Sequence, residues 1–203
     1  MTPWQPHRQA ALRARCNRAG VVFHFGVWHS DDDADDHLAA LNTLFAENLP
    51  HECTFNPAIA RCVPLDKRYL QAPTSLRPHH EYGKPVRPGS HAATLPENDP
   101  HNWYIHLYRA FNNPPYGLHG LSDADRQALW TDFCMQTGLL PQAHPQVFDW
   151  IRHEVYAGHR HQPVNHPLSN YFDDGLEWWG VWCLTVYSAA SHTLSAIVAS
   201  VTD

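Results

Sequence analysis

Histidine is the residue type that this chain carries in unusual number, 17 among 203 residues. His159 and His161 stand two positions apart, so an extended backbone points both imidazoles to the same side. His166 or Glu177 can supply a third ligand, and such a set suits a zinc or iron ion. The spacing predicts a metal site at His159, His161 and His166. The leading interpretation is nevertheless that these side chains are exposed loop or capping groups and that the protein needs no cofactor, with zinc or iron as the alternative.

Two other patterns resemble metal sites but fail on spacing. The helical zinc motif needs a second histidine four residues after the first, and after His153 that position is Ala157. The acidic run 31–36 resembles a calcium loop, yet Asp36 stands where the turn needs glycine and Asn42 where a bidentate glutamate belongs. We therefore interpret the acidic run as the solvated start of a helix, where carboxylates interact favourably with the helix dipole.

A cluster of carboxylates precedes a tryptophan-rich run near the end of the sequence. Asp173, Asp174 and Glu177 are followed at once by three tryptophans within five positions. Asp-Asp-Gly is ordinary turn sequence, and paired carboxylates can also perform acid–base chemistry. Large aromatic anchors beside charged groups are typical of protein interfaces. We predict a partner-binding site at Asp173, Asp174, Glu177 and Trp179.

The charge of the chain narrows the choice of partners. Lysine and arginine number 14 against 20 aspartates and glutamates, a formal net charge of −6 at pH 7. A general nucleic-acid binder is disfavoured, because contacts to phosphates need a basic surface. A basic protein partner fits, since opposite charges speed association. The leading hypothesis is a small acidic interaction protein, such as an immunity or inhibitor protein that binds and occludes a toxin or enzyme partner.

The competing hypothesis is a metal-dependent enzyme, a hydrolase or an oxygenase, built on His159, His161 and a carboxylate. The chain contains no dinucleotide-binding glycine motif, phosphate loop or nucleophile elbow, which favours binding over catalysis. A Cys/His or Ser/His dyad assembled by folding stays open.

Cysteine usage and hydropathy bear on the compartment. Five widely spaced cysteines without a Cys-x-x-Cys pair suit a reducing environment, and two of them, Cys134 and Cys183, lie in apolar runs typical of the core. No segment is apolar enough for a signal peptide or a membrane span. We expect a cytoplasmic protein that does not enter membranes.

The elements that position these groups form one α+β domain over residues 1–203, with a mixed or antiparallel sheet. A C-terminal β-hairpin, Trp178–Tyr187 with Leu194–Val201, is expected to pack against helices. Residues 50–100 hold nine of the 17 prolines and predict a long loop-rich segment. Periodicity and capping residues predict helices over 7–18, 37–45, 122–138 and 145–158, and strands over 21–28 and 103–111.

Strand alternation divides the tryptophans of the hairpin between two faces. Trp178 and Trp182 share their face with Leu184 and Val186, which predicts that they form a core pair. Trp179 falls on the other face, in line with Thr185. That second face is predicted to lie nearer the functional surface.

Overall fold

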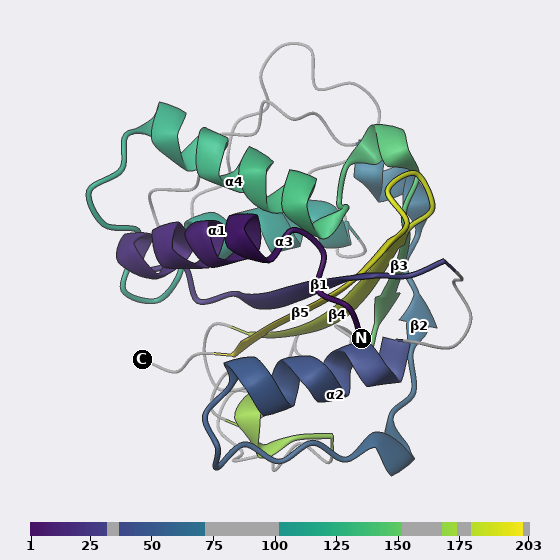
Figure 1. The fold of residues 1–203 in the computed structure, drawn as a ribbon. Coiled ribbons are helices and arrows are strands. Elements are labelled where there is room, and N and C mark those ends of the chain that lie inside the picture. Colours follow the sequence, from purple (N-terminus) through teal and green to yellow (C-terminus); the bar gives the residue numbers. More distant parts are fainter. Residues whose placement is uncertain (32–36, 72–101, 152–167, 174–179, 201–203) are drawn as a thin grey trace.

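The computed structural model describes residues 1–31, 37–71, 102–151, 168–173 and 180–200. Within them the chain has an α+β fold, in which four α-helices surround a five-stranded antiparallel sheet (Figure 1). The helices are α1 (Pro6–Ala19), α2 (His37–Asn48), α3 (Trp103–Asn112) and α4 (Asp123–Thr137). The strands are β1 (His24–His29), β2 (Val63–Pro64), β3 (Gln146–Asp149), β4 (Val181–Ser188) and β5 (Thr193–Ser200). Short 3-10 helices are η1 (Pro57–Ile59), η2 (Lys67–Gln71), η3 (Pro141–Ala143) and η5 (Asn170–Phe172).

The strand order is β1-β5-β4-β3-β2, so the last described strand, β5, lies inside the sheet between the edge strand β1 and the central strand β4. Both edges are protected. At the β1 edge, the N–H of His29 donates to the carbonyl of Thr2 and the N–H of Trp4 to that of Val27, each at 2.9 Å. At the opposite edge, Pro64 in β2 has no N–H to offer a further strand.

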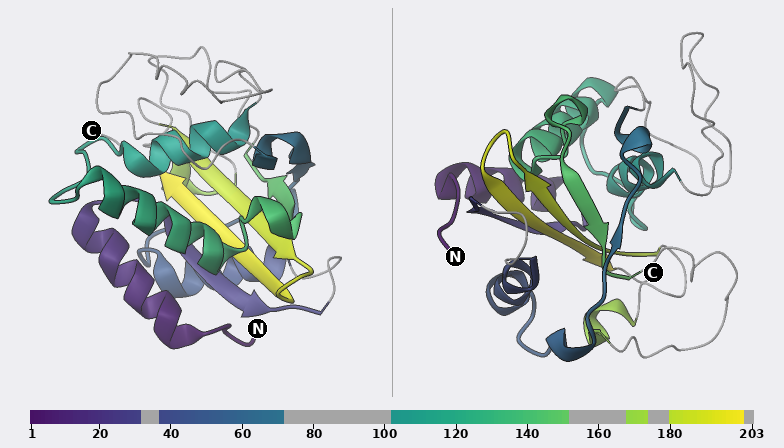
Figure 2. Two further views of the ribbon diagram at one scale, coloured as in Figure 1. Left: turned by 90° about the horizontal axis from the view of Figure 1, so that it is seen from above. Right: turned by 90° about the vertical axis from the view of Figure 1, so that its right-hand side faces the viewer.

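Helices cover both faces of the sheet. Helices α1, α3 and α4 lie side by side on one face, and α2 with η5 lies on the other (Figure 2). The side chains of β4 alternate between the two layers as a strand requires. Trp182, Leu184 and Val186 belong to the core beneath α1, α3 and α4, whereas Cys183 and Tyr187 belong to the core beneath α2.

This burial confirms that Trp182 is a core residue, with 5% of its surface exposed. The expectation that the face in line with Thr185 is a surface is wrong, because Thr185 is completely buried. Both faces of β4 are therefore covered from residue 181 to residue 188. Trp178 and Trp179 lie outside the described residues.

The capping residues fix the ends of α1 and α4 as the sequence predicts. Gly20 ends α1 in the left-handed region at φ 82°, and Gly138 ends α4 at φ 79°. Ser122 begins α4 with a capping box, in which its hydroxyl accepts from the N–H of Asp125 and the Asp125 carboxylate accepts from the N–H of Ser122. The C-terminal hairpin is also confirmed, as β4 and β5.

Two predicted elements are wrong. Residues 103–111 form α3 instead of a strand, and Asn102 caps the helix by accepting from the N–H of Ile105 at 3.2 Å. Residues 146–149 form β3 instead of the start of a helix, because Val147 and its neighbours pair with β4 on one side and with β2 on the other. The rest of the predicted helix, 152–158, lies outside the described residues.

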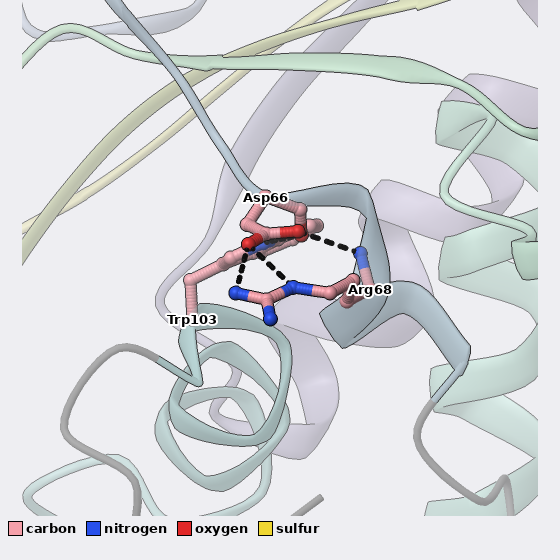
Figure 3. A network of polar contacts seen from close by, with 3 residues as sticks. All are labelled: Asp66, Arg68 and Trp103. Atoms are coloured by element: carbon pink, nitrogen blue, oxygen red, sulfur yellow. Dashed lines mark hydrogen bonds and ion pairs between the residues drawn. The ribbon is translucent and has the colours of Figure 1, made fainter.

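A polar network ties η2 to the start of α3 (Figure 3). The carboxylate of Asp66 accepts from the backbone N–H of Arg68 at 2.9 Å and from its guanidinium Nε at 2.8 Å. The indole N–H of Trp103 donates to the carbonyl of Asp66 at 3.0 Å. The hydrogen bonds from Arg68 lower the pKa of the Asp66 carboxyl. The network joins the segments on either side of residues 72–101.

None of the described helices is long and apolar enough to span a bilayer.

Candidate functional site

The predicted partner-binding site is described at one of its four residues. Asp173 follows η5, and its backbone N–H donates to the carbonyl of Asn170 at 3.2 Å. Asp174, Glu177 and Trp179 lie outside the described residues. The predicted metal ligands His159, His161 and His166 also lie outside them, so the zinc or iron site stays a prediction.

Around Asp173 the surface is organised by the side chain of Asn170. Its Oδ1 accepts from the backbone N–H of Thr54 at 2.8 Å and from the Thr54 hydroxyl at 3.2 Å. Its Nδ2 donates to the carbonyl of Glu52 at 3.1 Å. One amide thus joins two irregular segments that are far apart in the sequence. We call the group Glu52, Thr54, Asn170 and Asp173 the Asn170 surface.

Aromatic packing supports the Asn170 surface from below. Phe55 stacks on Phe45 of α2, with ring centroids 4.7 Å apart and planes inclined by 18°. Tyr171 and Phe172 of η5 meet Phe45 edge to face, at 6.1 and 6.0 Å. Such aromatic pairs stabilise by about 0.5–1.5 kcal/mol each beyond the area they bury. The loop and η5 are therefore held on α2 by side-chain packing as well as by the Asn170 amide.

The Asn170 surface carries negative charge, and its loop leads to one exposed apolar side chain. Glu52 is exposed and Asp173 is half-buried. The loop leads into η1, where Ile59 leaves 41% of its surface exposed. A second backbone hydrogen bond, from Asn56 to the carbonyl of Leu168 at 2.9 Å, fixes the loop just before η1. This combination is suited to contact with another molecule.

The fold also assembles a hydroxyl–imidazole pair. His37 Nδ1, at the first residue of α2, lies 2.8 Å from Thr185 Oγ1 in β4. The indole N–H of Trp150 donates to the same oxygen at 2.9 Å. Because Thr185 is completely buried, no substrate can reach its hydroxyl. The hydrogen bond between His37 and Thr185 joins α2 to the sheet, and the pair is not a catalytic dyad.

The cysteines offer no activated nucleophile. All five thiols are free. Burial raises the pKa of Cys16 to about 12, and it also raises the pKa of Cys134 and Cys183. Cys134 and Cys183 are core residues, as their apolar surroundings in the sequence predict. Among the described residues no three histidine, cysteine or acidic side chains gather closely enough to hold a metal ion.

The chain matches no protein-family model, and comparison with curated proteins and with solved structures found no match either. The assignment of function therefore depends on the geometry alone. The sequence prediction named Asp173 of this surface but neither Asn170 nor Glu52. No sequence signal marks them, because their contact joins segments that only the folded sheet and α2 bring together.

Proposed function

We propose that this protein is a small acidic interaction protein that binds and occludes a protein partner, in the manner of an immunity or inhibitor protein, through the Asn170 surface. The observation that carries the proposal is the Asn170 amide, which fixes Thr54 and Glu52 beside η5 and Asp173. A loop held in place before binding loses less conformational entropy when the complex forms. Irregular segments on a rigid scaffold are the usual carriers of binding function.

The charge of the surface indicates the partner's chemistry. Glu52 and Asp173 present carboxylates on a chain whose formal net charge is −6. A basic face, such as that of an enzyme which acts on nucleic acid, is attracted by this charge and is blocked once the complex has formed. The free thiols suit a reducing compartment, so the proposal places the protein in the cytoplasm.

Charge reversal tests the proposal. Tagged wild-type protein, expressed in its native cells, is expected to capture one partner in stoichiometric amount. Glu52→Lys and Asp173→Lys should each weaken the captured complex by about tenfold or more, with the larger effect at low salt. Asp31→Lys makes the same reversal at an exposed position just after β1 and is the control. Capture of no stoichiometric partner, or equal loss in the control, would refute the proposal.

A second variant separates the effect of the Asn170 hydrogen bonds on binding from the effect of the surface charge. Asn170→Ala keeps both carboxylates but removes the hydrogen bonds to Thr54 and Glu52. The Thr54 amide should then exchange with solvent faster, and the partner should bind more weakly at every salt concentration. Faster exchange with unchanged affinity would show that the partner does not use this loop.

A further inference from the structure

A pocket of about 290 Å³ opens between α1 and α4. These two helices cover the opposite face of the sheet from α2 and η5, beside which the Asn170 surface lies (Figure 2). Its volume is at the lower end of the range for small-molecule sites. Four of its side chains are wholly or mainly apolar, and Met135 among them leaves 55% of its surface exposed. These four side chains are Trp4, Ala11, Leu12 and Met135.

Gln136 lines this pocket with an unused hydrogen-bond donor. The residue is only 8% exposed, and its Nε2 has no hydrogen-bond partner among the described residues. A buried amide left unpaired costs stability, so a natural sequence that retains one has a reason to do so. An acceptor atom on a bound molecule would supply the missing partner.

Gln9, a buried glutamine in the same part of the protein, has its side-chain amide fully hydrogen-bonded, in contrast to Gln136. Its amide bridges α1 to β1 by accepting from the N–H of Val27 at 3.0 Å and donating to the carbonyl of Val27 at 2.7 Å. It also donates to the carbonyl of Trp4. Every polar atom of this buried side chain is used. Gln136 differs because its Nε2 has no partner among the described residues, although the side chain lines a pocket.

The charges at the pocket favour an anion. Arg8 and Arg15 line it, and Asp132 forms an ion pair with Arg15. The lining thus has two positive charges and one negative charge, an excess of one positive charge in a chain of net −6. Arg8 is exposed, and its guanidinium donates to the Gln5 side chain at 3.3 Å, where it can be diverted to a stronger acceptor.

The start of α1 adds to this positive potential. Gln5, which also lines the pocket, precedes the helix in the left-handed region at φ 44° and provides no side-chain cap. The first turn contains no acidic residue, and Pro6 occupies its first position. No carboxylate within the first turn therefore balances the positive end of the helix dipole.

We propose that the pocket between α1 and α4 binds a small apolar monocarboxylate. The Gln136 amide turns toward the pocket so that one carboxylate oxygen accepts from Nε2, the charge is balanced by Arg8, and the apolar part packs against Trp4, Leu12 and Met135. No bond is made or broken. The site is separate from the Asn170 surface, so either proposal can fail without the other.

The probe is 3-phenylpropanoate, with the neutral 3-phenylpropanamide as its matched analogue. In ¹⁵N-resolved NMR spectra of the full chain, the propanoate should shift the Trp4 indole and Gln136 amide signals saturably, with a dissociation constant on the order of 1 mM, as fragments of this size show. The amide should bind at least about fivefold more weakly, because hydrogen bonds to charged groups are the stronger ones. Arg8→Gln should remove that preference. Equal binding of both probes, or no saturable shift, would overturn the proposal.

Two glutamine variants complete the test. Gln136→Leu should weaken the propanoate by about tenfold, whereas Gln127→Leu, the same change on α4 outside the pocket, should leave binding unchanged. Gln136→Leu should melt at the wild-type temperature or above, because it removes an unpaired buried amide. A lower melting temperature would mean that the amide is already paired within the free protein. That result, or wild-type affinity in Gln136→Leu, would overturn the assignment.

Discussion

The ring of Trp28 folds back over Gly26, two residues earlier on the same face of β1. A Cβ added at Gly26 would lie 2.7 Å from Cζ2 of Trp28 and closer still to Cη2. Trp28 itself is 3% exposed and belongs to the core beneath α2. The glycine is therefore required by the space its neighbour occupies and not by a turn.

Replacing Gly26 with alanine should displace the Trp28 ring. We expect the free energy of unfolding to fall by about 1–3 kcal/mol, as overpacking of a core typically costs. Urea denaturation measures the loss. In a Trp28→Leu background the same substitution should cost clearly less, because the clashing ring is gone. Strictly additive losses would show that the two side chains do not collide.

The pH dependence of stability should include a contribution from His24. This half-buried residue of β1 has its ring 6.1 Å from that of Tyr171, and burial lowers its pKa. Above the ordinary histidine pKa of about 6.5, both folded and unfolded chains hold the ring neutral. Below it, the unfolded chain takes up the proton first, so stability falls until the pH reaches the lower folded pKa.

Thermal melts of wild type and His24→Gln between pH 7 and pH 5 should therefore converge as the pH falls. The wild-type protein loses the contribution of His24 over this interval, and the variant has none to lose. A constant difference between the two melting temperatures across the interval would contradict the assignment.

Thiol labelling should separate the cysteines by burial. Cys62 is exposed and Cys53 is half-buried, whereas Cys16, Cys134 and Cys183 are buried and their pKa values are raised by that burial. Iodoacetamide at pH 8 should modify Cys62 first in the native protein and the three buried thiols only in denaturant. Peptide mass mapping gives the order. Native labelling of Cys183 as fast as Cys62 would mean that the sheet opens readily.

Removing the last strand should abolish the fold. Deleting residues 194–203 takes away β5, which pairs with β1 on one side and β4 on the other, and exposes two apolar strand edges. The product should be insoluble. Deleting only 201–203 keeps β5 intact and is the control. A soluble truncated chain that melts cooperatively would be incompatible with this sheet.

The sequence predicted elements well where capping residues and periodicity agreed. Ser122 and Gly138 delimit α4, and Gly20 ends α1, because these effects are local. Prediction failed at 103–111, where helix α3 buries seven of its ten side chains. The three less buried residues, His106, Arg109 and Ala110, recur at helical spacing, so the amphipathic period was present in the sequence. The prediction of a strand followed the two-residue alternation of the same segment instead, and it was wrong.

The error at β3 and the absence of any sequence signal for the Asn170 surface have another cause in common. Val147 has neighbours at helical spacing, but the choice between helix and strand is made by β4, whose partner residues are distant in sequence. The Asn170 surface likewise depends on a hydrogen bond between Asn170 and Thr54. Periodicity within one segment contains no information about either contact.

The position of β5 between β1 and β4 also determines when the sheet can form during translation. His24 pairs with Val198, so β1 leaves the ribosome long before its partner has been translated. At about 5–20 residues per second, the wait is on the order of ten seconds. During that time the helices α1 and α4 can form locally, but β1 cannot join the sheet beneath them until β5 has been made. Folding of this chain is therefore expected to be a late, concerted event instead of a stepwise one that follows translation.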